Sequence, residues 1–161
     1  MDGGTVQGGF FEDFAISSKV ISMSRTVTET DIVNFVCNYG FFEELFIDME
    51  YVKSSSIFKE RFAPGALTYC IAEGLALQAL KRRHFAGMAF LGMEHFVISQ
   101  PLYCNDTIHV EIEVTSKRET QNKERGIISF HHKVINQRDE VIMEYDVARM
   151  TKRSPISCAT D

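Results

Sequence analysis

The chain has 161 residues, the size of one ordinary domain with a substantial hydrophobic core. Hydrophobic residues make up 45% of it and charged residues 24%, proportions typical of soluble globular proteins. The formal net charge of -5 argues against general affinity for nucleic acid, which requires clustered Lys and Arg side chains. Glu119 and Glu124 interrupt the basic segment from Lys117 to Arg125, which favours a solvated hairpin over a phosphate-binding surface.

The sequence shows no pattern of a signal peptide, a membrane span or a disulfide framework. We expect residues 1–9 and 154–161 to be disordered, on either side of a single domain of residues 10–153. The four cysteines are widely separated, and Cys37 and Cys70 lie in helical apolar patterns, where we expect them to pack as small hydrophobic residues. The sequence therefore predicts a cytoplasmic protein that holds no metal.

The first predicted elements are a strand over residues 18–26 and a helix that ends near Gly40. Thr28 is the expected N-cap of this helix, with Asp31 as the acidic partner of a capping box. The helix is expected to face the core with residues at helical spacing, namely Ile32, Phe35, Val36 and Tyr39.

The next long helix is predicted over residues 64–81 and is apolar on nearly all sides. Between Ala66 and Leu80 the exceptions are Thr68, Glu73, Gly74 and Gln78. Such a helix must be buried on most of its surface. Pro64 suits the first turn, because its missing N–H has no partner to lose there.

After this helix only strand patterns follow. Residues 90–99 form one strand, and residues 108–114 alternate strictly between apolar and polar side chains. Two further alternating segments flank a turn over residues 136–139. One buried helix followed by long antiparallel strands predicts an α+β domain, in which a curved sheet wraps around the helix.

Two sequence motifs resemble those of a known protein family. Residues 40–48 read Gly-Phe-Phe-Glu-Glu-Leu-Phe-Ile-Asp, and residues 63–65 read Ala-Pro-Gly at the start of the long helix. In order and spacing they resemble the signature G-D-x-N-P-x-H-x-D, followed by F-G-G-x-I-A-P/H-G, of the MaoC-like (R)-specific enoyl-thioester hydratases and dehydratases. The resemblance covers about residues 18–153 and includes the turns at residues 105–107 and 136–137.

The resemblance implies a hot-dog fold whose sheets pair edge to edge in a homodimer, or in a heterodimer with an active homologue. It also implies an acyl-CoA or acyl-carrier-protein thioester as the bound molecule, and no cofactor. The family's catalytic Asp aligns with Phe41 and its catalytic His with Phe46, so its acid–base chemistry is absent here. Lys59 and Glu60 replace the two glycines of the second motif.

Gly65 aligns with the family's oxyanion donor, where a helix N-terminus stabilises developing negative charge; alternatively, Pro64-Gly65 only turns the chain into the helix. Phe41 and Phe46 either reshape the substrate pocket or add core packing. The resemblance places Pro64, Thr68 and Tyr69 beside Phe41 and Phe46 as substrate-binding residues.

The candidate proton-transfer groups are Glu43 and Glu73. Glu43, like its neighbour Glu44, is either a solvated loop carboxylate or a base at the pocket mouth, whereas Asp48 is better explained as a helix N-cap. Glu73 lies eight residues after Gly65, the offset of the catalytic glutamate in some hot-dog acyl-CoA thioesterases. Alternatively, Glu73 pairs with Lys or Arg at a dimer edge. We expect the histidines to lie at the surface or the core edge.

These features predict a protein that processes acyl-CoA or acyl-carrier-protein thioesters. Its chemistry on the enoyl or acyl thioester would differ from that of the family, because the Asp/His pair is absent. The alternatives are a thioesterase that uses Glu73 and a non-catalytic acyl-thioester-binding subunit.

Overall fold

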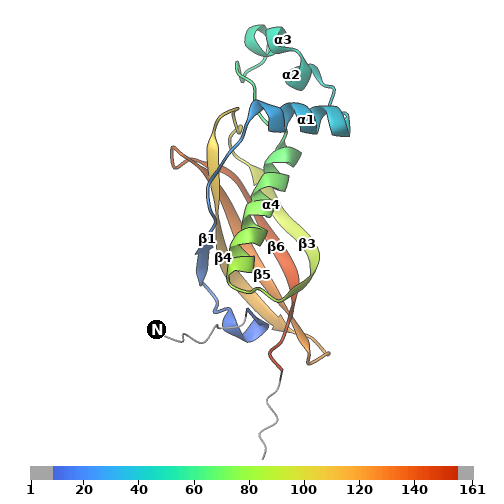
Figure 1. Ribbon diagram of the computed structural model, residues 1–161, viewed down its shortest axis with the longest axis vertical. Helices are drawn as coiled ribbons and strands as arrows, with labels where there is room; N and C mark the ends of the chain where they lie inside the picture. The colour runs from blue at the N-terminus through green and yellow to red at the C-terminus, as the bar shows by residue number, and fades with distance from the viewer. Residues whose placement is uncertain (1–8, 156–161) are drawn as a thin grey trace, which may run out of the picture.

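In the computed structural model, which describes residues 9–155, one antiparallel sheet curves around the helix α4 (Gly65–Arg82) (Figure 1). The sheet order is β1-β4-β5-β6-β3, and β2 also pairs with β4. The strands are β1 (Lys19–Ile21), β2 (Arg25–Thr26), β3 (Gly87–Ile98), β4 (Thr107–Glu119), β5 (Arg125–Asn136) and β6 (Val141–Lys152). The remaining helices are α1 (Glu29–Tyr39), α2 (Glu44–Ile47), α3 (Met49–Ser54) and the short 3-10 helix η1 (Phe11–Asp13). This arrangement confirms the predicted α+β hot-dog fold.

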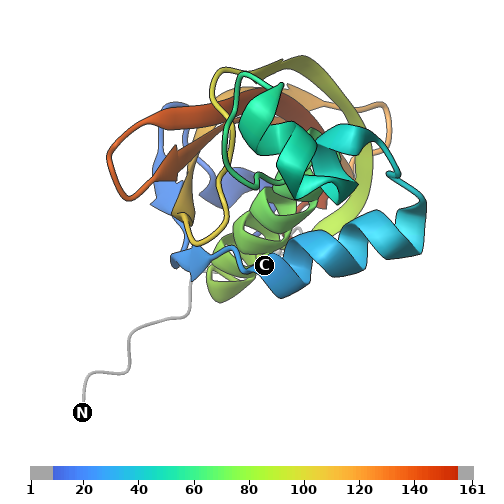
Figure 2. The same ribbon diagram turned by 90° about the horizontal axis from the view of Figure 1, so that it is seen from above.

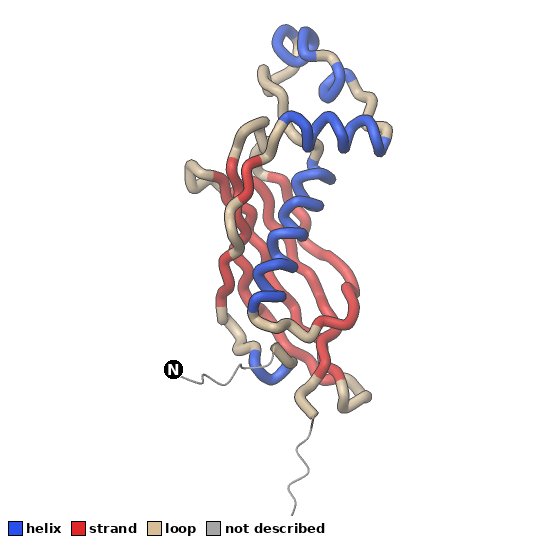
Figure 3. The backbone as a smooth tube through the Cα atoms, viewed as in Figure 1, coloured by secondary structure: helices blue, strands red, loops and turns tan. Residues whose placement is uncertain are grey.

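The helix α4 buries one face against the concave side of the sheet (Figure 3). Its buried residues include Leu67, Ile71, Leu75 and Ala79, at the spacing of one helical face. The helix is thus buried on most sides, as predicted: eight of its 18 residues are buried and four are half-buried, while Cys70, Leu77 and Gln78 are among the exposed ones.

The capping of α1 agrees with the sequence pattern. The Thr28 hydroxyl accepts the Asp31 backbone N–H at 3.2 Å, and the Asp31 carboxylate accepts the Thr28 backbone N–H at 2.9 Å. Ile32 and Val36 are buried, but Tyr39 points outward and contacts the Phe35 ring. Cys37 is exposed like Cys70, so the expectation that these two cysteines pack inside was wrong: the apolar stripe of each helix leaves them on its outer side.

The long strands follow the predicted alternation, with small differences at their ends. The predicted first strand over residues 18–26 is two short strands, β1 and β2, separated by residues 22–24. β3 begins at Gly87 and carries three register shifts against β6. The turn after β5 is confirmed: the Asn136 side-chain oxygen accepts the backbone N–H groups of Arg138 and Glu140.

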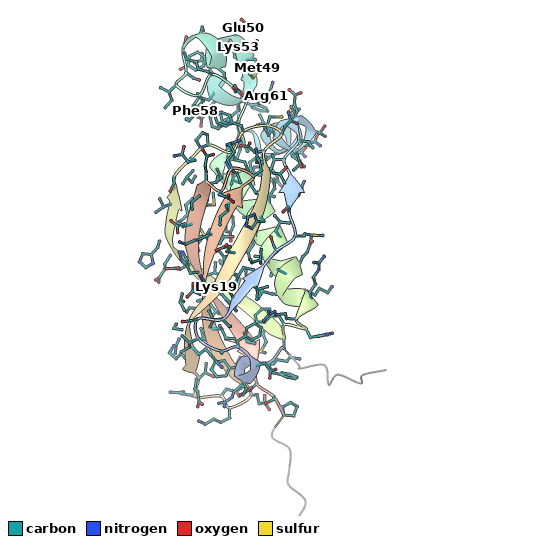
Figure 4. All side chains as sticks on the ribbon, turned by 90° about the vertical axis from the view of Figure 1, so that its left-hand side faces the viewer. Lys19, Met49, Glu50, Lys53, Phe58 and Arg61 are labelled. Carbon is teal, nitrogen blue, oxygen red and sulfur yellow. The ribbon has the colours of Figure 1, made fainter. Side chains whose placement is uncertain are left out.

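The segment from α1 to α3 covers the end of the sheet at which α4 begins (Figure 2). Asp48 caps α3 by accepting the backbone N–H groups of Glu50 and Tyr51 at 2.9 and 3.0 Å, as predicted. Arg61 fastens this segment, since it pairs with Glu29 of α1 at 3.0 Å and donates to the Phe46 carbonyl at 3.3 Å. Phe58 and Arg61, labelled in Figure 4, lie on the chain that descends from α3 to α4.

The expectation of disordered ends falls mainly on residues 1–8 and 156–161, outside the described residues. Two residues next to these ends make ordered contacts: the Gly9 carbonyl accepts the Ala86 N–H, and the Ser154 N–H donates to Glu12. Among residues 9–155, no helix has the length and apolar character to span a membrane.

Candidate functional site

A cavity of about 320 Å³ lies where α4 begins, between the helix N-terminus and the end of β3. Its walls are mostly apolar, and its polar side chains come from Thr68, Ser99 and Gln100. The apolar lining residues include Phe58, Phe62, Ile98 and Leu102. A cavity of this size and character suits an apolar group of a small ligand.

Gly65 lines this cavity at the first position of α4. The first N–H groups of a helix have no partner within it, and the helix dipole makes them good donors to an anionic oxygen. Ile98 presses close to Gly65, and a Cβ atom at this position would clash with the Ile98 side chain. The atom that it would meet is the end of a flexible side chain, so a larger residue at this position would require only that Ile98 turn aside.

The other predicted substrate-binding residues divide between two places. Thr68 lines the cavity, but its hydroxyl donates to the Pro64 carbonyl at 3.3 Å. Pro64 is buried as the N-cap of α4. Tyr69 lies apart from this cavity and contacts the rings of Phe96 and Tyr145, where burial raises the pKa of its hydroxyl.

Phe41 and Phe46 belong to a chain of aromatic rings behind the cavity. Their ring centroids lie 6.4 Å apart, and Phe46 contacts Phe62 at 5.4 Å. Phe62 in turn packs on Phe58 at 4.1 Å, and both of these rings line the cavity. Phe41 and Phe46 thus form an apolar layer behind the wall and offer no group that can transfer a proton.

The backbone supports the alignment that places these two phenylalanines on the signature. Gly40 and Lys59 both have left-handed φ angles, of 74° and 63°. A left-handed φ favours glycine, which is the residue that the signature has at both positions. Lys59 therefore keeps a backbone conformation suited to glycine although it carries a side chain.

Glu43 and Glu44 lie at the start of α2, exposed to solvent. Glu43 is the N-cap residue of α2, but its side chain accepts no capping hydrogen bond. Neither carboxylate is among the residues that line the cavity. This arrangement favours the interpretation of both as solvated loop carboxylates.

Glu73 is held by a buried arginine from the sheet. Its carboxylate accepts a hydrogen bond from Arg149 of β6, and its second oxygen lies 3.9 Å from Nδ1 of His132 on β5. The Arg149 and Glu73 side chains are 6% and 15% exposed, so the pair is largely shielded from water. Of the two interpretations offered for Glu73, this geometry favours the ion pair with a cation.

His132 and Arg149 were missed as partners of Glu73, although the sequence carried a signal. The expectation that all histidines lie at the surface or core edge was wrong for His132, which is fully buried against Tyr145. The alternation in β5 places His132 on the same face as Phe130 and Val134. The same period in β6 places Arg149 on the face of Tyr145.

Burial controls the protonation of this cluster. Burial and, to a smaller extent, the neighbouring His131 together lower the pKa of His132 to about 3, although Asp146 acts in the opposite direction. Among residues 9–155, both His132 ring nitrogens, the Tyr145 hydroxyl and Nε of Arg149 are buried without a hydrogen-bond partner.

His132 should therefore make the protein less stable in acid. The unfolded chain protonates this histidine near its ordinary pKa of 6.5, and the folded protein does so only near 3. Between these values the unfolded state binds more protons, so the free energy of unfolding falls as the pH falls, by about 2 kcal/mol from pH 6.5 to pH 5. Urea unfolding of wild type and His132→Leu should show this loss in the wild type alone.

His109→Gln is the control for this prediction, since His109 is only half-buried on β4. It should keep the pH dependence of the wild type. Equal acid sensitivity of the wild type and His132→Leu would show that His132 is protonated in the folded protein.

Within the described part of the chain, no group of three or more His, Cys, Asp or Glu side chains is arranged to hold a metal ion. The three described cysteines, Cys37, Cys70 and Cys104, are free thiols.

Comparison with known proteins places this geometry in a family. Residues 13–135 match the model of the MaoC like domain. Protein MaoC of Klebsiella aerogenes is 33% identical over 118 residues, which are 73% of this chain and 33% of that protein. Beta-methylmalyl-CoA dehydratase of Chloroflexus aurantiacus is 27% identical over 148 residues, which are 90% of this chain and 40% of that protein.

The chain thus spans only 33% and 40% of the lengths of these two curated relatives. Among solved structures, the monoamine oxidase regulatory protein from Archaeoglobus fulgius superposes with a TM-score of 0.85 at 29% identity, covering 92% of this chain and 97% of that one. The matched model includes the loop with Phe41 and Phe46, the start of α4 and most of the sheet. The chain belongs to the MaoC-like domain family.

Proposed function

We propose that the protein binds the acyl group of a CoA or acyl-carrier-protein thioester in the Gly65 cavity. The observation that carries this proposal is the apolar cavity with the unpaired N-terminal N–H groups of α4 at its edge. A thioester oxygen at this position would accept the Gly65 N–H, and the helix dipole would polarise the carbonyl. The name of the Chloroflexus relative, a dehydratase of a CoA thioester, agrees with this ligand class.

We further propose that the family's hydration and dehydration chemistry is lost. That chemistry needs a general acid and base, and phenylalanine occupies both aligned positions. No carboxylate or histidine is among the residues that line the cavity, all of which belong to the described part of the chain. The geometry best fits a protein that binds and polarises an acyl thioester, either as a non-catalytic subunit or with altered chemistry on an enoyl or acyl thioester.

Thioester hydrolysis with Glu73 as nucleophile or base has less support. The Glu73 carboxylate is engaged by Arg149, and Glu73 is not among the residues that line the Gly65 cavity. A carboxylate committed to a buried ion pair is a weak nucleophile, because attack would strand the guanidinium charge. We therefore assign Glu73 a structural role.

The binding proposal is tested by Gly65→Ala. The added methyl group would take the space now held by the end of the Ile98 side chain, at the edge of the cavity where the Gly65 N–H lies. Titration calorimetry with 2-oxopentyl-CoA, a non-hydrolysable ketone analogue of butyryl-CoA that keeps the carbonyl oxygen, should show binding to the wild type and affinity reduced about two- to tenfold in the variant, the net value of one neutral hydrogen bond.

Gly74→Ala is the matched control, because a Cβ atom at Gly74, on the same helix, meets no atom within 4 Å. It should bind the analogue as the wild type does. Unchanged affinity of Gly65→Ala would contradict the proposed position of the thioester.

We propose that the protein forms a dimer through the free edge of β3. This edge strand is long and carries exposed apolar side chains, including Phe90, Leu91, Met93 and Phe96. An open apolar edge promotes aggregation unless another chain covers it. Sedimentation equilibrium of the purified protein should give about twice the chain mass of 18.3 kDa, the mass of a homodimer. If the protein is co-expressed with a homologue that has the Asp and His, a heterodimer of similar mass is the alternative. A monomer at micromolar concentration would contradict this assembly.

We also propose a cytoplasmic location. The support is chemical: Cys37 and Cys70 are exposed free thiols, which persist in a reducing compartment.

A further inference from the structure

A second cavity, of about 410 Å³, lies between the C-terminal half of α4 and the beginning of β3. It shares no lining residue with the Gly65 cavity. Leu77 and Lys81, which line it, are 12 and 16 residues beyond Gly65 along α4. At a rise of about 1.5 Å per residue, they lie roughly 18 to 24 Å from the proposed thioester position.

The walls of this second cavity combine apolar surface with two cations. Leu77, Phe85, Met88 and Phe90 supply the apolar part, and Lys81 and Arg149 supply the charge. None of its lining residues, all from the described part of the chain, is acidic. Because Glu73 neutralises Arg149, the cavity keeps a net charge of about one, from Lys81 at its exposed rim.

Arg149 is the buried charged residue of this cavity. Its side chain is 94% buried (6% exposed), its guanidinium lies 5.5 Å from the centre of the Phe90 ring, and one nitrogen donates to Glu73. Nε is also buried but has no hydrogen-bond partner among residues 9–155. Because Nε is sealed from solvent, the contact open to a carboxylate in the cavity is the small exposed part of the Arg149 side chain, which lines it.

We propose that this second cavity binds a monocarboxylate with an apolar chain. Arg149 would donate to the carboxylate oxygens, Lys81 would balance the added negative charge, and the apolar chain would lie on Leu77, Phe85 and Met88. A single positive charge suits a monoanion, and the apolar walls disfavour a small, strongly hydrated anion such as phosphate. This site is independent of the Gly65 cavity and does not rest on the function proposed for it.

Titration calorimetry with octanoate on the purified full chain tests this proposal, with octanol as the uncharged ligand of equal tail. Octanoate should bind and octanol should bind at least about tenfold more weakly, the value of one charged hydrogen bond. Lys81→Gln should weaken octanoate about two- to fivefold, as expected for an exposed ion pair. Arg82→Gln, the same change at the neighbouring exposed residue outside the cavity, should have no effect.

Two further variants test whether octanoate binds in this cavity and not elsewhere on the protein. Leu77→Trp should abolish octanoate binding by filling the cavity from an exposed helix position, while binding of the acyl-CoA analogue persists. The paired change Glu73→Gln/Arg149→Met, which strands no charge, should weaken octanoate at least about tenfold. Equal binding of octanol would overturn the proposal, as would octanoate binding that survives Leu77→Trp.

The cavity also adjoins the edge strand of the proposed dimer. If a second copy fills it, octanoate will not bind and Leu77→Trp will shift the monomer–dimer equilibrium. That pair of results would overturn the ligand proposal and would leave the thioester site unaffected.

Discussion

Purified protein mixed with crotonyl-CoA should show no detectable addition of water under conditions in which a MaoC-family hydratase with the intact Asp and His is fast. If Phe41 and Phe46 replace the family's acid and base as proposed, each missing group lowers the rate by about 10²- to 10⁴-fold, so the loss of both exceeds roughly 10⁴-fold. The decrease of enoyl-thioester absorbance measures the rate directly. A robust hydratase rate would mean that the alignment through Gly40 is shifted.

A gain of activity is the sharper form of this test. Phe41→Asp/Phe46→His restores the aligned groups in a loop that keeps the expected backbone at Gly40 and Lys59. We expect hydration to rise at least about a hundredfold above the wild-type background, the lower value for one acid–base group. The control Phe42→Asp/Ile47→His makes the same changes one residue later, at two exposed side chains, and should remain inactive.

Glu73→Gln should lower the free energy of unfolding by about 3 to 5 kcal/mol. The change removes the charge that balances Arg149, whose guanidinium then remains buried without a counter-charge. Urea unfolding at neutral pH measures the loss. Thioester turnover, if the protein has any, should be nearly unchanged, because Glu73 is not among the residues that line the Gly65 cavity.

The double variant Glu73→Gln/Arg149→Met should recover most of this stability, since it removes both charges together. Glu50→Gln is the surface control: its partner Lys53 lies 3.3 Å away and both side chains are exposed, so its effect should stay below about 1 kcal/mol. Turnover reduced by orders of magnitude with unchanged stability would instead identify Glu73 as catalytic and restore the thioesterase hypothesis.

The fold could be predicted because its main signals are local. The capping box at Thr28 and Asp31, the apolar helix after Pro64 and the alternation within each long strand depend on residues close in sequence. The structure begins α4 at Gly65 and ends it at Arg82, within one residue of the predicted bounds. The prediction of the first strand was less accurate. It is divided into β1 and β2, and each pairs with a different part of β4, which lies far away in the sequence.

The candidate site was less predictable, because its contacts join distant segments. Glu73 is 76 residues from Arg149 in sequence, and only the register between β5 and β6 brings His132 and Arg149 to the same cluster. A carboxylate on an apolar helix needs a positively charged partner, but the sequence alone does not show which Lys or Arg pairs with Glu73. Gly65 lines the cavity, and its role as oxyanion donor stays a prediction, whereas Glu43 lies outside because the course of the loop after Gly40 is not a periodic pattern.

The two edges of the sheet differ in a way that limits how many copies can associate. The edge opposite β3 consists of β1 and β2, of three and two residues, with a break at residues 22–24. In this break the Ser22 hydroxyl accepts the Val110 N–H at 2.9 Å, which occupies a backbone donor of β4. A two-fold pair uses each β3 edge once and leaves only these interrupted edges outside. The proposed association through β3 would therefore be self-terminating: two copies would complete one another, and the finished pair would present only these interrupted edges, on which a fibre could not readily grow.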